Sequence, residues 1–296
     1  MAENLKDLVA AELAEPVDPR VNAMAAAIAA LYPGAARAVL FYGSCLRERQ
    51  LDGLMLDFYL IVSDYRAAYE RRWLAAANRL IPPNVFPFEH EGLAAKYAVL
   101  SEADFARECG SDARSVSVWA RFAQPARLVW AADEAARQHV VVGVAKAAPT
   151  LFELARPLVL DDMQNDPIAV FRAGFALTYA AELRTERWRR VGTIVDADPE
   201  RYRRFGRAIL ASANVGTASP RAAQRGWRWR RRNGKALSIL RLAKASFTFA
   251  GGIDYLAWKI NRHAGTRIVL KPWQRRWPLL AGFILLPRLL KWGAIR

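Results

Sequence analysis

The chain has 296 residues, of which 53% are hydrophobic, and it carries a formal net charge of +16. This length and composition are enough for a sizeable buried core in two or three compact units. Two cysteines, Cys45 and Cys109, exclude a disulfide framework, and neither has a partner at the spacing of a metal site, so a reducing compartment is expected.

The chain begins with "MAENLKDLVAAELAEPVDPR", which has acids where a signal or transit peptide needs bases, and no apolar centre. We therefore expect a soluble beginning without a targeting segment. The next segment, 23–31, has the spacing of a helix.

Two short apolar runs, 38–42 and 54–62, are bounded by Gly and polar residues, which predicts two adjacent strands of a buried sheet. Gly43 and Ser44 end the first run, where the backbone can approach a ligand closely and N–H groups with a hydroxyl can hold phosphate oxygens. Asp57 lies on the second strand. A carboxylate beside a phosphate-binding turn indicates Mg²⁺, although an ordinary turn with a solvated acid has the same spacing.

The middle of the chain continues with alternating helices and strands. The pattern predicts a helix at 67–80, strands at 94–101 and 125–131, and helices at 135–154, 168–190 and 199–211. Residues 214–220, "NVGTASP", read as a linker.

The positive charge is concentrated after this linker. From Arg221 onward there are 18 Lys and Arg against one acid, Asp254, whereas the first 220 residues hold 26 bases and 27 acids. Such a surface predicts a polyanionic partner, either nucleic acid or a membrane face.

Aromatic and aliphatic residues favour the membrane. Trp and Leu alternate with bases along 225–262, and the apolar run 277–287 is too short for a bilayer span, which needs about 20 residues. A segment of this kind lies in the interface of an anionic membrane. The alternative is that its apolar residues pack back on the protein. The apolar and aromatic residues assigned to the membrane are Trp227, Trp229, Leu237, Leu240, Leu242, Phe247, Phe249, Leu256, Trp258 and Ile260.

Several ordered motifs carry a resemblance to a known family. They are "YGSC" at 42–45, "GLMLDFYLIVSD" at 53–64, "KYAVLS" at 96–101, "VWARFAQPARLV" at 118–129, "LTYAAELR" at 177–184 and "ASFTFAGGIDYLAWKI" at 245–260. In this order they resemble the mitochondrial-type phosphatidate cytidylyltransferases, also called translocator assembly and maintenance proteins, of the polymerase-β-like nucleotidyltransferase superfamily.

The resemblance implies an activity and a fold. Phosphatidic acid would attack the α-phosphorus of CTP, releasing pyrophosphate and forming CDP-diacylglycerol, with Mg²⁺ or another divalent cation on the triphosphate. The expected fold class is α/β: a nucleotidyltransferase domain with a mixed sheet at 1–133, a mainly helical, winged-helix-like module at 134–220, and a basic amphipathic, membrane-associating region at 221–296.

The resemblance also assigns roles to residues. Asp57 ligates the metal, and Asp64 is either a second catalytic ligand or only the end of the strand. The nucleotide phosphates are held by Tyr42, Gly43, Ser44, Lys96 and Arg121. Tyr179, Glu182 and Arg184 close the substrate site or, alternatively, form a packing ion pair between domains.

The sequence departs from the family pattern in four places. Cys45 replaces a glycine, Ala123-Gln124 replace His-Lys, Ala181-Glu182 replace Gly-Asp, and Tyr59 stands where the wider Asp-x-Asp pattern has its second acid. The second metal ligand must then come from elsewhere, and the candidates are Asp64, Glu89, Glu91 and Glu102.

Three functions remain open. The favoured one is a cytidylyltransferase of phospholipid biosynthesis, in the cytoplasm and peripheral on the inner face of the cell membrane, whose acceptor is phosphatidic acid or a related lipid phosphate such as a sphingolipid phosphate. The second is a nucleotidyltransferase that acts on RNA, with the basic tail as a backbone groove. The third is a non-catalytic membrane adaptor that retains the fold.

Overall fold

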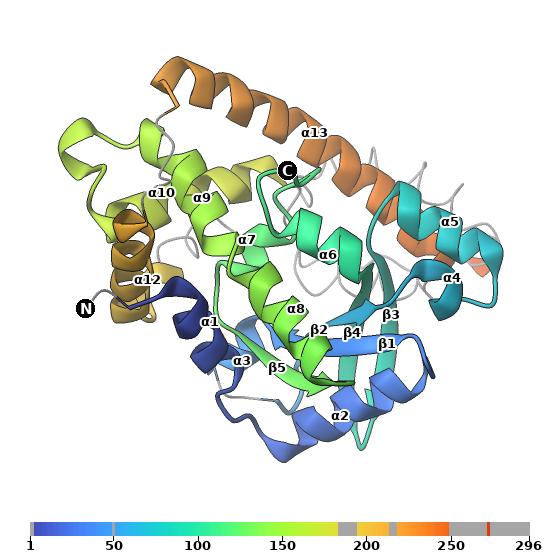
Figure 1. Cartoon of the computed structure of the whole chain (residues 1–296). Coiled ribbons are helices and arrows are strands. Elements are labelled where there is room, and N and C mark those ends of the chain that lie inside the picture. The colour runs from blue at the N-terminus through green and yellow to red at the C-terminus, as the bar shows by residue number, and fades with distance from the viewer. Residues whose placement is uncertain (1–2, 49–50, 183–193, 213–217, 249–270, 273–296) are drawn as a thin grey trace.

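The computed structural model describes residues 3–48, 51–182, 194–212, 218–248 and 271–272. Within these residues the chain forms one five-stranded mixed sheet flanked by helices, which confirms the predicted α/β class (Figure 1). Arg184, the apolar run 277–287 and the tail beyond residue 248, apart from 271–272, lie outside the described residues.

The sheet contains five strands in the order β3-β4-β2-β1-β5. They are β1 (Ala36–Tyr42), β2 (Met55–Val62), β3 (Asn84–His90), β4 (Leu93–Ser101) and β5 (Ala126–Ala131). β2 and β4 are parallel, and the other neighbouring pairs are antiparallel. The two runs that the sequence predicted as adjacent strands are therefore neighbours, at the centre of the sheet.

Helices cover both faces of this sheet, which is why its central strands are apolar on both sides. One face is covered by α2 (Pro19–Ala30), α4 (Tyr65–Ala68) and α5 (Arg72–Leu80). The other face carries a larger core built with α1 (Leu5–Leu13), α6 (Glu102–Glu108), α7 (Trp119–Phe122), α8 (Glu134–Val144), α9 (Ala147–Ala155), α10 (Pro167–Ala181), α12 (Pro199–Ala211) and α13 (Pro220–Thr248). This continuous core contains residues from all three predicted regions.

Three helices begin at an Asp-Pro dipeptide. Asp18, Asp166 and Asp198 each accept a backbone N–H bond from the first turn of α2, α10 and α12, and the proline that follows occupies the first helical position. An aspartate cap satisfies an orphan N–H group and the fixed φ of proline suits that position. These dipeptides are thus the sequence signals that start the helices.

The structure corrects several predicted boundaries. The helix expected at 67–80 is two helices, α4 and α5, and the helix expected at 135–154 is divided into α8 and α9. The sequence also missed β3, because it contains Pro87, which removes a backbone donor. β3 tolerates this proline because it is an edge strand.

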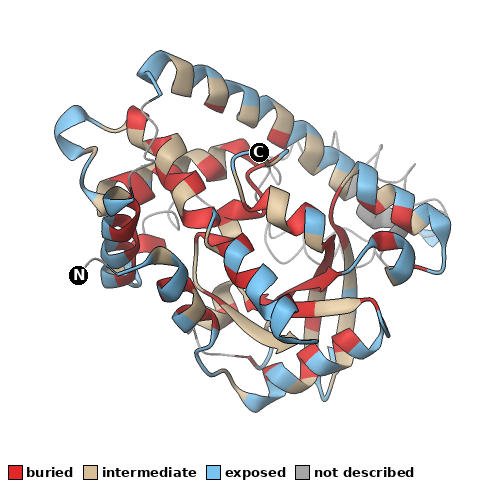
Figure 2. Ribbon diagram, in the orientation of Figure 1, coloured by how far each residue is buried: buried red, intermediate tan, exposed pale blue. Residues whose placement is uncertain are grey.

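Helix α13 corrects part of the membrane prediction. Trp227 is only 1% exposed, packs edge-to-face against Trp119 with a 6.3 Å centroid separation, and donates its indole N–H to the Leu154 carbonyl oxygen at 2.8 Å. Gly234 permits a close crossing, since a Cβ there would lie 2.3 Å from the Ala181 carbonyl oxygen. Figure 2 shows the buried residues of α13 on the side toward the body and exposed ones along the other side. For Trp227 the packing alternative is therefore correct.

The short elements complete the chain. They are α3 (Ser44–Glu48) and the 3-10 turns Arg156–Leu158 and Asp161–Met163. Among the described helices, none is both long enough and apolar enough to cross a bilayer.

Candidate functional site

Three neighbouring strands bring Tyr42, Asp57 and Lys96 into one row. Tyr42 on β1 pairs with Asp57 on β2, and Asp57 pairs with Lys96 on β4. Residues that pair directly across a sheet point to the same face, so the three side chains lie side by side. The Lys96 Nζ atom is 2.9 Å from Asp57 Oδ1, which forms an ion pair at the centre of the row. We call Tyr42, Asp57 and Lys96 the Asp57 row.

Gly43 follows Tyr42 and leaves room beside the Asp57 carboxylate. Its φ is +99°, a conformation that L side chains rarely adopt, and a Cβ at this position would lie 3.1 Å from Asp57 Oδ2. Ser44 comes next and begins α3. The turn predicted to hold phosphate therefore lies against the carboxylate predicted to hold the metal.

Arg121 on α7 extends the site behind the row. Burial alone would lower the pKa of Arg121, but the surrounding groups, chiefly Tyr59 and Glu182, raise that pKa above its ordinary value. Its guanidinium donates to the Ser117 carbonyl oxygen and lies 3.7 Å from Glu182 Oε1. Arg121 therefore stays positively charged beside the row at every physiological pH.

The two tyrosines of the site are neutral phenols. Burial raises the pKa of Tyr42 well above its usual value, and the Asp57 charge raises it further. Burial likewise raises the pKa of Tyr59, which lies two residues after Asp57 on the same strand face. The rings of Tyr42 and Tyr59 are 5.3 Å apart, and Tyr59 also packs on Phe122. Tyr59 thus packs in the core and does not take the role of the second acid of the Asp-x-Asp pattern.

Asp64 lies at the other end of β2. Asp64 comes seven positions after Asp57, two residues beyond the end of β2, which is about 23 Å of extended chain at 3.3 Å per residue. Its carboxylate caps α4 and accepts the backbone N–H groups of Arg66 at 2.6 Å and Ala67 at 3.1 Å. The two aspartates are therefore too far apart to share a cation. The position of Asp64 agrees with the alternative in which it only ends the strand.

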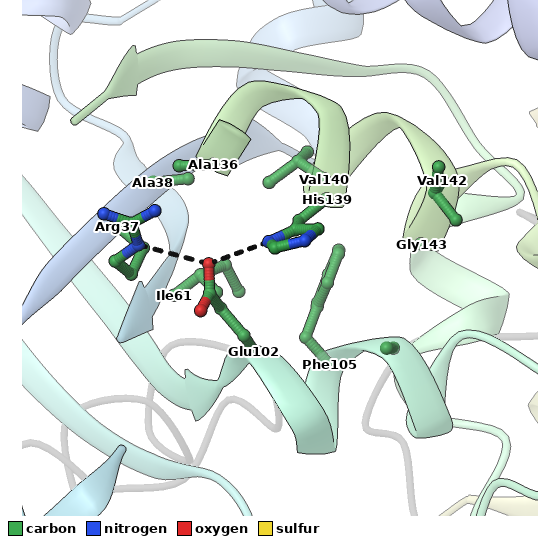
Figure 3. Close-up of a pocket in the computed structure, with 11 residues that line it drawn as sticks. Arg37, Ala38, Ile61, Glu102, Phe105, Ala136, His139, Val140, Val142 and Gly143 are labelled. Carbon is green, nitrogen blue, oxygen red and sulfur yellow. Dashed lines mark hydrogen bonds and ion pairs between the residues drawn. The ribbon is translucent and has the colours of Figure 1, made fainter. Parts of the chain in front are cut away.

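Glu102 also belongs to the far end of the sheet. Its Oε1 atom accepts from Arg37 Nε at 3.2 Å and lies 3.3 Å from His139 Nδ1 (Figure 3). These groups border an apolar cavity of about 210 Å³ between α6, α8 and the sheet, whose lining includes Ile61 and Phe105. Glu102 is thus committed to Arg37 and is remote from Asp57.

The hairpin glutamates lie nearer to Asp57 but not beside it. Glu91 is the turn residue, with φ +49°, and Glu89 pairs with Ala94 on the edge of the sheet. In this register Glu89 is on the same face as Asp57, two strands away and about 12 Å distant between Cα positions. Across the described residues, no three His, Cys, Asp or Glu side chains converge as a metal-binding group.

A single carboxylate is nevertheless compatible with Mg²⁺. This ion retains several waters and is commonly bound by one or two carboxylates together with substrate phosphates. Asp57 Oδ2 faces the space that a side chain at Gly43 would fill, so the carboxylate is reachable from the turn at Gly43 and Ser44. The residues present therefore fit a cation that arrives with a nucleotide.

The helical residues predicted to close the site are placed differently. Glu182, at the end of α10, accepts from the Ser117 hydroxyl and pairs with Arg121, so it does lie behind the row. This pair also links α10 to α7, as the packing alternative requires. Tyr179 is half-buried against the main core, and Arg184 lies outside the described residues.

Two cations on the inner side of α13 contact this part of the protein, and sequence reasoning missed them. Arg241 donates to the Ser117 hydroxyl at 2.6 Å, and Lys244 donates to backbone carbonyls before β3. Their charge was visible in the sequence but was assigned to the membrane. Only the packing of α13 reveals that they face inward.

Comparisons with known proteins found no protein-family model that matches this chain and no curated protein that matches it.

Proposed function

We propose that this protein is a CTP-dependent cytidylyltransferase that converts phosphatidic acid, or a related lipid phosphate, to a CDP-lipid. The observation that carries the proposal is the register of β1, β2 and β4, which sets a carboxylate and an ammonium beside a glycine turn. An acid for the cation, a base for the phosphates and close backbone approach are what transfer of a nucleotidyl group needs.

The proposed reaction requires little covalent chemistry from the chain. An oxygen of the lipid phosphate forms a bond to the α-phosphorus of CTP, and the bond from that phosphorus to the β-phosphate oxygen breaks, so pyrophosphate leaves. The lipid phosphate is already an anionic nucleophile, and no strong general base is needed. A bound Mg²⁺ would neutralise charge on the triphosphate and orient it for in-line displacement.

The residues of the Asp57 row have distinct roles in this proposal. Asp57 would hold the cation, and Lys96, released from its ion pair with Asp57, would bind phosphate oxygens as a point charge. The backbone at Gly43 and the hydroxyl of Ser44 would bind the terminal phosphates. Arg121 remains protonated and would balance the negative charge that accumulates near Tyr42.

The fold proposal follows from the same resemblance. A mixed sheet whose central strands carry the motif residues is compatible with a polymerase-β-like nucleotidyltransferase domain. For residues 134–220 we propose the winged-helix-like module of the resembling family. The described helices of that region, α8, α9, α10 and α12, pack on the same core as the sheet.

The outer face of α13 supports a membrane-bound acceptor. Trp229 is 57% exposed and Leu240 is 47% exposed, and an interval of 11 residues places them on the same side of a helix. The exposed bases along α13 are Arg221, Arg225, Arg228, Arg231, Arg232 and Lys235. Apolar side chains beside many cations suit the interface of an anionic membrane.

The test of the reaction is product analysis. The purified chain is incubated with CTP, Mg²⁺ and a panel of phosphatidic acid, sphingosine 1-phosphate, ceramide 1-phosphate and short RNA, and the products are identified by mass. We expect one equivalent of pyrophosphate for each CDP-lipid formed. Extension of the RNA alone, or no CTP turnover with any acceptor, contradicts the proposal.

The test of the membrane face is sedimentation with vesicles of phosphatidylcholine that contain phosphatidylglycerol. We expect the double variant Trp229→Ala, Leu240→Ala to bind about tenfold more weakly, because it removes apolar area that salt does not screen. The matched control is Trp73→Ala on α5, a tryptophan that is 46% exposed. Equal loss in both variants, or in neither, contradicts docking through α13.

A further inference from the structure

The inner side of α13 carries two cations one turn apart. Arg241 donates through Nε to the Pro82 carbonyl oxygen at 2.7 Å, and through its two Nη atoms to the hydroxyls of Ser117 at 2.6 Å and Ser115 at 3.1 Å. Lys244 donates to the carbonyl oxygens of Ile81 and Pro83, the latter at 2.7 Å. The five acceptors are all uncharged.

Neither cation has a carboxylate partner within the part of the chain that the structure describes. Two acids act on Arg241 through their charge: Glu182, which pairs with Arg121 and accepts from Ser117, and Glu108, which pairs with Arg107. Of the three cations Arg121, Arg241 and Lys244, only Arg121 forms an ion pair with a carboxylate among the described residues. Arg121 and Arg241 are both in electrostatic reach of Tyr59, because the charge of each lowers the pKa of its phenol against the larger effect of burial.

Burying the two charges of Arg241 and Lys244 side by side is energetically unfavourable unless an anion is bound. Burial lowers the pKa of Arg241, and burial together with the Arg241 charge lowers the pKa of Lys244 to about 7. Desolvated like charges oppose one another, and a bound anion would remove that opposition. A guanidinium has five N–H donors and an ammonium has three, so two donors on Arg241 and one on Lys244 are still available.

We propose that Arg241 and Lys244 form a subsite for a phosphate monoester on the inner side of α13, with Arg241 in electrostatic reach of Tyr59 and Arg121. The subsite rests on the proposed function, in which it takes the phosphate of the acceptor, while Gly43 and Lys96 take those of the nucleotide. Separate groups of cations would then hold two anions that otherwise repel. The basic helix thereby serves the membrane with its outer face and the substrate with its inner one.

The first test uses sulfate, a tetrahedral dianion whose charge does not change near neutral pH. Calorimetric titration of the full chain at pH 6.5 is compared with Arg241→Gln and Lys244→Gln. We expect each variant to bind sulfate about tenfold more weakly, since each loses a charge-assisted bond. The matched control is Lys235→Gln, an exposed base on the same helix, which should bind as the wild type does.

The pH dependence separates this subsite from a general basic surface. A bound anion favours protonated Lys244, so affinity should fall as pH rises through about 7, by at most the roughly tenfold loss expected when Lys244→Gln removes the same charge. Lys244→Arg should retain affinity and lose that pH dependence, because a guanidinium stays charged. This conservative variant also remains informative if Arg241→Gln fails to fold.

A second arm distinguishes a lipid headgroup from a free phosphate. Glycerol 3-phosphate and a short-chain phosphatidic acid are titrated in the same way, and tighter binding of the lipid identifies the headgroup as the ligand. Equal binding assigns the subsite to phosphate monoesters generally. Sulfate affinity that is unchanged in folded Arg241→Gln and Lys244→Gln, or lost equally in Lys235→Gln, overturns the subsite. CTP turnover is measured separately, so its absence contradicts the proposed function and not the anion site.

Discussion

The two ends of β2 carry the same residue type in different surroundings. At one end, Asp57 pairs with Lys96 across the sheet and faces the gap at Gly43. At the other end, Asp64 accepts two backbone N–H groups and caps α4. Asp57 is paired with a lysine side chain, whereas Asp64 is bound by the backbone of a helix. An acid bound to backbone amides is fixed in a structural role.

The difference shows that neighbouring strands decide what a carboxylate can do. In the sequence motif at 53–64, Asp57 and Asp64 are both acids of one pattern, and nothing in the motif distinguishes them. The register of β1 and β4 delivers a glycine, a tyrosine and a lysine to the first and none of these to the second. In the proposed function, chemistry on this strand is therefore confined to one end.

The largest expected effect comes from exchanging each aspartate for asparagine. Asp57→Asn should lower CDP-lipid formation at least 100-fold, because the change preserves shape but removes the charge that holds a cation. Asp64→Asn should leave the rate within about twofold, since asparagine is also a good helix cap. Turnover is measured for both with circular dichroism as the check of folding. Comparable losses in the two variants would break the comparison.

A smaller effect should follow from filling the gap beside Asp57. Gly43→Ala forces a Cβ to within 3.1 Å of Asp57 Oδ2 at a φ of +99°, so we expect about a tenfold loss of activity and about 1 kcal/mol of stability. Gly34→Ala is the matched control, because Gly34 has a φ of +72° and open space around it. The control should lose similar stability in urea unfolding and no activity. Loss of activity in Gly34→Ala as well would mean that backbone strain alone inactivates the protein.

The smallest effect belongs to the polar cluster at the Asp64 end. Glu102→Gln weakens the contacts with Arg37 and His139, which are partly exposed. The free energy of unfolding in urea should therefore fall by about 1 kcal/mol, and turnover should not change. Glu134→Gln, which alters an exposed glutamate on α8, serves as the control. A loss of activity in Glu102→Gln alone would show that the two ends of β2 are coupled.

The sequence predicted the central strands and the location of Asp57 because apolar runs bounded by Gly are local signals. The resemblance assigned Lys96 and Asp57 to one nucleotide site, but the sequence did not predict their direct pairing, since β2 and β4 are segments about 40 residues apart. It placed Trp227 at the membrane because alternating Trp and Arg in a sequence do not show which side of a helix is covered. It did not predict β3 because Pro87 argues against a strand, and only the position of β3 at the edge of the sheet makes this proline tolerable.

The most direct measurement is binding of Mn²⁺ in the presence of CTP, followed by electron paramagnetic resonance, because it needs no lipid acceptor. The account predicts that the wild-type chain and Asp64→Asn bind Mn²⁺ with similar affinity and that Asp57→Asn binds it at least tenfold more weakly. Unchanged Mn²⁺ binding in a folded Asp57→Asn protein, or a loss confined to Asp64→Asn, would contradict the claim that the Asp57 row receives the cation and the nucleotide.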